Sequence, residues 1–124
     1  MDIVWFNEQP RESVVTLGAG SITLNKPATT YFENAYSVML GTDPVKKYIV
    51  IKPLNKAEAV SNVIPQYKKY RISVHSSYSR ITNKAFMNEI MEISGLDLRN
   101  RTYKFPATWN KTEQVLVVDL NGGV

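Results

Sequence analysis

The residues best suited to chemistry form a basic and aromatic stretch, "QYKKYRISVHSSYSRITNK", from Gln66 to Lys84. No acidic residue occurs between Glu58 and Glu89. Cations without neighbouring acids attract phosphate oxygens, and tyrosines among them stack on bases or donate hydrogen bonds to phosphates. The stretch therefore indicates a nucleic-acid-binding surface, although a solvated strand face with half-buried tyrosines has the same composition. Its candidate phosphate ligands are Lys68, Lys69, Arg71, Arg80 and Lys84.

The distribution of charge agrees with this location. Residues 1–62 carry six basic and six acidic side chains, whereas residues 63–124 carry nine basic and five acidic, so the net charge of +4 lies in the second half. Arg80 is the candidate for a base-edge contact, because a guanidinium group binds guanine with two hydrogen bonds. Lys26 is a weaker counterpart in the first half. Double-stranded DNA is therefore the expected partner.

Catalytic and metal-binding groups are few in this sequence. The chain has no cysteine, which excludes disulfides, thiolate catalysis and cysteine–zinc sites, and His75 is its only histidine. Metal sites need several converging ligands, and the sequence has neither a Walker loop nor a zinc-protease motif. Glu89 and Glu92 have the spacing of a carboxylate pair on a helix, but such a pair is more typical of a wet face. We expect no enzymatic activity, no cofactor and no metal.

The elements that must position these residues are predicted to be mainly strands. β-Branched and alternating patterns predict strands over 13–17, 21–24, 36–41, 48–54, 70–74, 80–82, 102–109 and 114–120. Pro106 interrupts one of these segments and cannot donate a ladder hydrogen bond, which predicts an edge or bulged strand. The apolar run of the last segment, "QVLVVDL", predicts burial on most of both faces.

Two short helices are predicted after the second and sixth of these strands. Asn25 and Asn83 each stand directly before a lysine, and asparagine is a favoured N-cap residue. The first helix, over 26–35, contains threonines and is expected to be short. The second, over 84–94, has apolar residues at helical spacing and ends at Gly95, a natural C-terminal residue.

The order of elements is the same in both halves of the chain. A chain of 124 residues is predicted to form one compact domain, 1–124, made of two similar halves, 13–54 and 69–120. A linker over 55–68 joins them, and its "KAEAVSNV" segment has the composition of one or two helical turns. "SITLNK" and "SRITNK" mark the corresponding places in the two halves.

The first half resembles the AbrB/MazE family of swapped-hairpin, or looped-hinge, DNA-binding domains. "LGAGSITLNKPATTYFENA" and "YSVMLGTDPVKKYIVIKPL" follow the family's order of strand, glycine turn, strand, short helix and hairpin, and "VHSSYSRITNKAFMNEIMEISGLDL" with "QVLVVDL" follows it more loosely. In that family two chains exchange hairpins to complete one barrel. The resemblance implies that two copies in this chain form a pseudo-dimer, with each half burying the other.

The departures from the family pattern concern its DNA contacts. Ser21 stands where the family usually has an arginine, whereas Arg80 stands in the matching place of the second half. The usual proline after the Ile-Thr strand is displaced to Pro27 in the first half and is missing from the second. The resemblance therefore implies a mostly β, α+β fold, a swapped-hairpin-like β-barrel with two short helices, whose second half dominates DNA binding as a transcriptional regulator.

A second hypothesis keeps the fold and removes the nucleic acid. The chain would then be a protein–protein interaction module, either antitoxin-like or part of a scaffold. Trp5, Phe6 and Trp109 are large enough to mark a partner surface, but packing in the core or over the barrel is the expected use of such groups. The protein is expected to be cytoplasmic, without a membrane partner, and a monomer or a homodimer.

Overall fold

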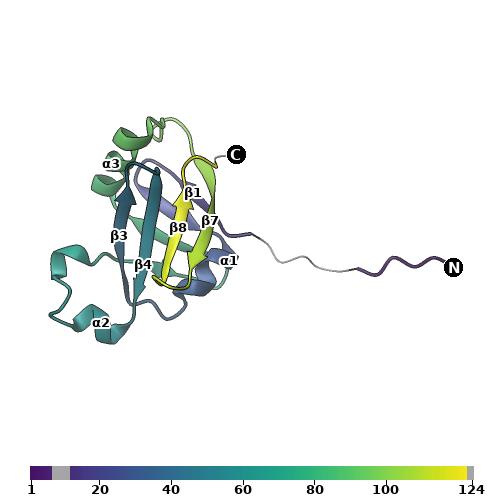
Figure 1. Cartoon of the computed structure of the whole chain (residues 1–124), viewed down its shortest axis with the longest axis horizontal. Helices are drawn as coiled ribbons and strands as arrows, with labels where there is room; N and C mark the ends of the chain where they lie inside the picture. Colours follow the sequence, from purple (N-terminus) through teal and green to yellow (C-terminus); the bar gives the residue numbers. More distant parts are fainter. Residues whose placement is uncertain (7–11, 123–124) are drawn as a thin grey trace.

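The computed structural model describes residues 1–6 and 12–122, and within them eight strands form one antiparallel, curled sheet (Figure 1). The strands are β1 (Val14–Leu17), β2 (Ser21–Leu24), β3 (Ser37–Asp43), β4 (Tyr48–Leu54), β5 (Ser73–Val74), β6 (Ser79–Thr82), β7 (Tyr103–Asn110) and β8 (Val115–Asp119). The helices are α1 (Lys26–Thr29), α2 (Lys56–Val60) and α3 (Lys84–Ser94), with 3₁₀ turns η1 (Thr30–Phe32) and η2 (Gln66–Lys68). The predicted mostly β architecture with short helices is confirmed.

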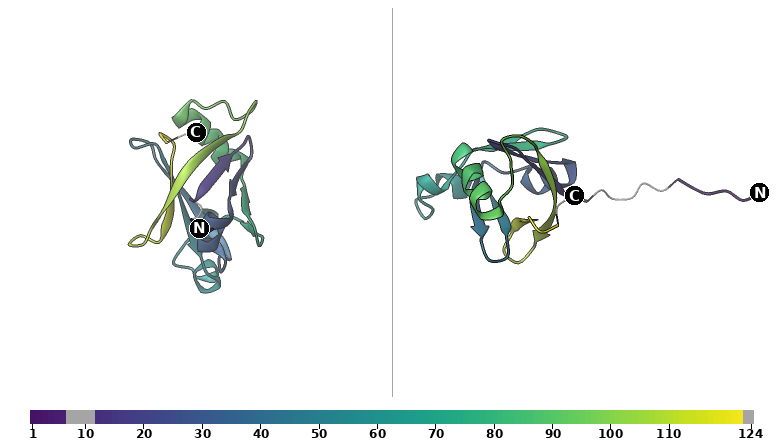
Figure 2. Two further views of the ribbon diagram at one scale, coloured as in Figure 1. Left: turned by 90° about the vertical axis from the view of Figure 1, so that its right-hand side faces the viewer. Right: turned by 90° about the horizontal axis from the view of Figure 1, so that it is seen from above.

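The sheet curls until its two outer strands approach each other. Its strand order is β3-β4-β8-β7-β1-β2-β6-β5. Near the two ends of this order, Val38 of β3 and Tyr70, just before β5, exchange backbone hydrogen bonds of 2.9 and 2.8 Å. The sheet is thus a half-barrel, and the two views of Figure 2 show its curl. Its two edges meet at this one bridge among the described residues.

The core fills the inside of this curled sheet. Alternation along each strand turns one set of side chains inward, for example Val15 of β1, Ile22 of β2 and Ile81 of β6, each no more than 1% exposed. Met87 and Ile90 of α3 join the same cluster, so this helix covers one opening of the half-barrel. The burial predicted for most of both faces of the last strand is confirmed for one face, because Leu116 and Val118 of β8 are fully buried, whereas Val117 and Asp119 on the other face are half-buried.

The predicted helix starts are also confirmed. The side chain of Asn25 accepts a hydrogen bond from the backbone N–H of Ala28 at 3.2 Å, and that of Asn83 accepts one from Phe86 at 2.9 Å. Each bond satisfies one of the N–H groups that a helix start leaves without an intrahelical partner. At its other end, α3 stops at Gly95, whose φ of 73° is the left-handed conformation that glycine adopts readily.

The first helix is shorter than the predicted 26–35. It is α-helical only over Lys26–Thr29 and continues as a 3₁₀ turn to Phe32. Threonine hydroxyls compete for backbone groups here, because the hydroxyl of Thr29 donates to Leu24 O at 3.2 Å and that of Thr30 to Pro27 O at 2.6 Å.

The segment between the halves has structure of its own. Asn55 and Glu58 form a reciprocal capping box at the start of α2, with bonds of 2.9 and 3.1 Å. Ala59 on this helix is only 6% exposed, so α2 is packed against the body. The helical turn predicted for "KAEAVSNV" is confirmed over Lys56–Val60.

Of the two alternatives predicted from Pro106, an edge or a bulged strand, the edge strand is wrong. The strand that contains it, β7, lies between β1 and β8. The N–H of Ala107 donates to Ser13 O on the β1 side, so the ring nitrogen of the preceding Pro106 faces the β8 side. The β7–β8 pairing ends at Ala107 with Val118, so Pro106 stands just beyond that ladder and costs it no hydrogen bond.

The expected packing of the aromatic residues holds for only one of them. Trp109 is half-buried and stacks on Tyr31, with ring centroids 4.6 Å apart. Trp5 and Phe6 are 80% and 91% exposed, so their predicted packing in the core or over the barrel is wrong. None of the helices in the described ranges is long and apolar enough to cross a membrane.

Candidate nucleic-acid interface

A row of polar and cationic side chains crosses the outside of the sheet. The cross-strand register places Ser73, Arg80, Thr23, Thr16 and Lys104 opposite one another on β5, β6, β2, β1 and β7. Their chain neighbours Val15, Ile22, Ile81 and Phe105 are buried, so alternation turns this set towards solvent. We call these five residues the cationic row.

The strands that carry the cationic row contain no acidic residue. Aspartates occur instead on the strands of the other part of the sheet, Asp43 on β3 and Asp119 on β8. The side-chain contacts of Arg80 are with neutral groups. Its Nε lies 3.4 Å from the Thr23 hydroxyl, and its guanidinium carbon lies 5.7 Å from the centre of the Tyr78 ring. Among the described residues, the arginine charge is therefore held in place without being neutralised by a carboxylate.

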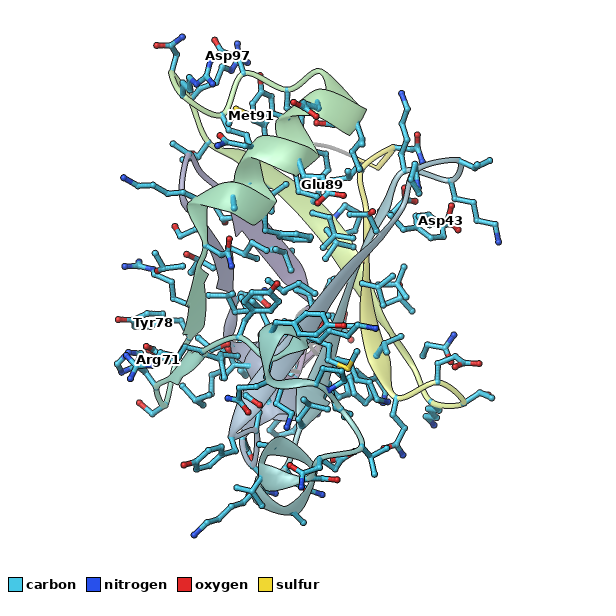
Figure 3. All side chains as sticks on the ribbon, turned by 90° about the vertical axis from the view of Figure 1, so that its left-hand side faces the viewer. Asp43, Arg71, Tyr78, Glu89, Met91 and Asp97 are labelled. Carbon is cyan, nitrogen blue, oxygen red and sulfur yellow. The ribbon has the colours of Figure 1, made fainter. Side chains whose placement is uncertain are left out.

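The β5–β6 hairpin brings further predicted residues to the same region. His75 stacks on Tyr78 with ring centroids 4.6 Å apart, and the backbone N–H of His75 donates to Tyr78 O at 2.8 Å. Arg71 is exposed just before β5 and projects on the same side of the molecule as Tyr78 (Figure 3). The hairpin and the residues just before it thus carry two cations, Arg71 and Arg80, and two stacked rings, a combination that suits phosphates and bases.

Lys84 lies at the far end of β6 from the hairpin turn. A Cβ added to Gly20 would lie 3.2 Å from Lys84 Cγ, so the lysine stem passes over the β1–β2 turn. A side chain here would make a tight contact, and the lysine stem would have to shift by a few tenths of an ångström. Of the six sequence-predicted residues, Arg71, Arg80 and Lys84 therefore lie along the β5–β6 side.

The other three predicted residues do not belong to this group. Lys26 follows the end of β2, which pairs with the start of β6, so it lies at the opposite end of the β2–β6 pair from Lys84. Lys68 is exposed on η2. Lys69 is half-buried, and its Nζ donates to Ala59 O at 2.7 Å and to Ser61 O at 2.8 Å. Lys69 therefore satisfies carbonyl groups at the end of α2, which indicates a structural role for it.

The two adjacent lysines should differ in how much stability is lost when each is replaced by methionine. We expect Lys69→Met to lower the free energy of unfolding by about 1–3 kcal/mol, because two half-buried carbonyls lose their donor. We expect Lys68→Met to change that free energy by less than about 0.5 kcal/mol, since its side chain is exposed. Urea unfolding of both variants checks this expectation, and equal losses would contradict it.

Sequence patterns did not identify Lys104, Thr16 and Thr23. Lys104 alternates with buried Phe105 in "TYKFPATW", which indicates only that the lysine faces solvent. Its position next to Thr16 depends on the pairing of β7 with β1, two strands that are far apart in the chain. No local pattern reports such a pairing.

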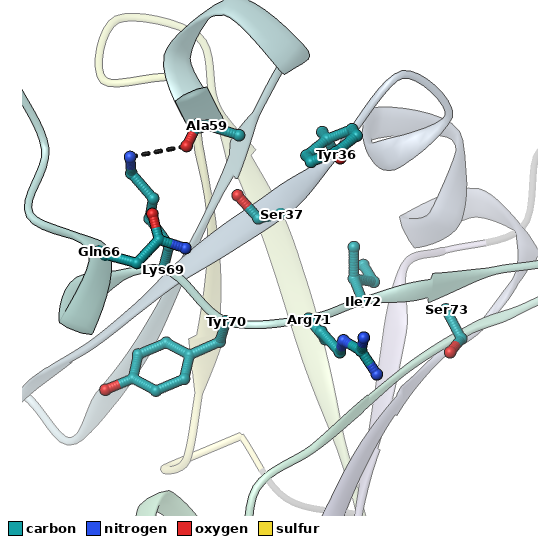
Figure 4. A pocket seen from close by; sticks show the side chains of 9 residues that line it. All are labelled: Tyr36, Ser37, Ala59, Gln66, Lys69, Tyr70, Arg71, Ile72 and Ser73. Atoms are coloured by element: carbon teal, nitrogen blue, oxygen red, sulfur yellow. Dashed lines mark hydrogen bonds between the residues drawn. The ribbon is translucent and has the colours of Figure 1, made fainter. Parts of the chain in front are cut away.

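A pocket of about 470 Å³ adjoins the row at Ser73 (Figure 4). It lies where β3 meets the segment before β5, and neutral or basic residues line it, including Tyr36, Gln66 and Arg71. The Ser37 hydroxyl also lines it and is buried without a hydrogen-bond partner in the structure. The pocket therefore extends the acid-free region past Ser73, the first residue of β5, towards the segment that precedes this strand.

The described residues offer little for catalysis or for metal binding. His75 stacks on a tyrosine ring, and Glu89 and Glu92 are both exposed on α3. Across residues 1–6 and 12–122, no three histidine or acidic side chains gather as a metal site would require.

The chain was also compared with known proteins. No protein-family model, curated protein or solved structure matches it.

Proposed function

We propose that this protein binds double-stranded DNA through the cationic row and the β5–β6 hairpin, and that it acts as a small AbrB-like transcriptional regulator. The observation that carries the proposal is the acid-free row from Ser73 to Lys104, whose two cations are Arg80 and Lys104. Phosphate contacts from such a surface supply affinity, and a base-edge contact adds specificity.

The β5–β6 hairpin is the part suited to enter a groove. The major groove admits a two-stranded ribbon, and these two strands lie at one end of the sheet order. Arg80 faces outward on this ribbon, and its Tyr78 and Thr23 contacts fix the guanidinium group. Arg80 is therefore the residue proposed to bind guanine, while Arg71 and Lys84 bind flanking phosphates.

The spacing of the row supports a further phosphate contact beside the groove. Arg80 and Lys104 are separated by three strand-to-strand steps, which is roughly 14 Å along the sheet. The major groove is about 12 Å wide. With Arg80 at a guanine inside the groove, Lys104 therefore lies beyond the groove and acts as a further phosphate contact.

The swapped-hairpin duplication is also part of the proposal. In a duplication, β1 corresponds to β5, β2 to β6, β3 to β7 and β4 to β8. If each strand is renamed as its counterpart, the pairs β2–β6 and β4–β8 stay the same, and the pair β1–β7 becomes β5–β3. The latter pairing corresponds to the Val38–Tyr70 bridge. This pattern supports a pseudo-dimer in which each half lends a hairpin to the other.

The proposal is tested by fluorescence anisotropy of labelled double-stranded DNA across a series of salt concentrations. We expect log affinity to fall linearly with log salt, and Lys104→Met to reduce the slope by about 1. The matched control is Lys46→Met, because Lys46 is exposed in the β3–β4 turn, away from the row. Absence of binding at low salt would exclude the proposed function and favour a protein partner.

A further inference from the structure

The first six residues carry the most exposed apolar cluster of the molecule. Ile3, Val4, Trp5 and Phe6 are 54%, 95%, 80% and 91% exposed, and Figure 1 shows this segment extending from the body. We call residues 1–6 the arm. Contiguous exposed groups of this size are typical of an interaction site, and β-branched and aromatic residues favour an extended strand.

The same molecule has an unpaired strand edge on β3. The backbone groups of Val38 point away from β4 and bond to Tyr70. Backbone groups of alternate residues point the same way along a strand, so those of Leu40 and Thr42 also point away from β4. The strand β3 is at one end of the sheet order. The N–H and C=O groups of Leu40 and Thr42 thus form a template for one more strand within the described structure.

This edge lacks the usual protection against strand addition. Natural edge strands carry lysine, proline or a bulge, or they are very short. The β3 strand is seven residues long and has neither lysine nor proline, and its only charged residue is Asp43 at its end. The opposite edge strand, β5, has only two residues.

The arm cannot readily reach the β3 edge of its own chain. It leads to β1, which is four strands from β3 in either direction around the curled sheet. The eight residues from Phe6 to Val14 span at most about 28 Å. The path from β1 halfway around the curled sheet to β3 is roughly 20 Å when it is measured along the strand backbones. It is about twice as long when it runs outside the side chains. A second copy of the chain is therefore the favoured acceptor.

We propose that the arm of one copy adds as a strand to the β3 edge of a second copy. Backbone hydrogen bonds to Leu40 and Thr42 would hold it, and alternate arm side chains would cover the half-buried apolar groups of that face. The outcome is self-association that depends on residues 3–6 and on the edge of β3. This interaction is independent of DNA binding.

Sedimentation velocity of the full chain over about a hundredfold range of concentration tests this proposal. The arm variant is Trp5→Asp with Phe6→Asp, and its matched control is Val63→Asp with Tyr67→Asp, which places two acids at sites that are 88% and 75% exposed. We expect the wild type and the control to associate, and the arm variant to have a dissociation constant at least about tenfold higher. A monomeric wild type, or an arm variant that associates normally, would overturn the proposal.

A cysteine pair locates the contact, since the chain has no cysteine of its own. A chain with Phe6→Cys and Thr42→Cys is expected to form disulfide-linked oligomers under mild oxidation. A disulfide within a single chain would show that the arm reaches its own edge, and no crosslink despite arm-dependent association would place the arm elsewhere. Either result overturns the assignment to the β3 edge of a second copy.

Discussion

Arg80→Glu is expected to weaken DNA binding by at least about tenfold, which corresponds to about 1.4 kcal/mol. The substitution removes one of the two cations of the row and places a carboxylate where a guanine is proposed to bind, close to phosphates. Arg80 is exposed and its contacts are with Thr23 and Tyr78, so the fold should remain intact. Anisotropy with labelled duplex DNA at fixed salt measures the change.

Two controls make the Arg80 result specific. Lys46→Glu changes the net charge equally at a site away from the row, and it should alter affinity much less. Arg80→Lys keeps the charge but loses the planar fork, so it should retain most of the non-specific affinity and lose preference for guanine. Equal losses for Arg80→Glu and Lys46→Glu would mean that only net charge matters, and would contradict the proposed role of Arg80.

Local chemistry was sufficient to predict where most elements begin. Strand patterns, the asparagine N-caps and Gly95 are properties of a few neighbouring residues, and the structure uses Asn25, Asn83 and Gly95 as expected. The first helix was predicted too long because its threonine hydroxyls bond to backbone carbonyls. Helix propensity alone does not include this competition of side-chain hydroxyls for backbone carbonyl groups.

Pairing between distant strands was beyond any local pattern. Pro106 was assigned to an edge or bulged strand because the side on which its nitrogen lies cannot be known without the order of β1, β7 and β8. The same pairing places Lys104 beside Thr16 and completes the row. Lys69 was grouped with free cations because its acceptors, Ala59 and Ser61, became neighbours only after the chain turned back through η2.

The two halves also differ in a way that motif matching hides. Leu24 and Thr82 each precede a cap asparagine, yet Leu24 is buried and Thr82 is exposed. The strand faces are therefore reversed relative to the caps. In β6 the buried residues are Ser79 and Ile81, which turns Arg80 outward, whereas in β2 Ile22 and Leu24 are buried. Ser21 and Arg80, each directly before a buried isoleucine, nevertheless both face outward, so the second half presents an arginine at this place because of its residue type.

The largest effect on stability is expected for Phe32→Ala. Phe32 is fully buried at the end of η1 and meets the edge of Trp109, with ring centroids 6.4 Å apart. Removing a buried phenyl ring leaves a cavity, so the free energy of unfolding should fall by about 3–5 kcal/mol. Domains of this size have about 5–15 kcal/mol in total, and the variant should therefore unfold at much lower urea concentration.

The position of Trp109 gives this prediction a second measurement and a matched control. Trp109 also stacks on Tyr31, so loss of Phe32 should increase the mobility of the indole and shift its fluorescence before global unfolding. Phe6→Ala makes the same chemical change at a residue that is 91% exposed, and it should alter the free energy of unfolding by less than about 0.5 kcal/mol. Both variants should be compared at the lowest workable protein concentration, where association of copies contributes least. A small loss for Phe32→Ala would show that η1 repacks over the opening of the half-barrel without the ring, and that α1 is not a fixed part of the core.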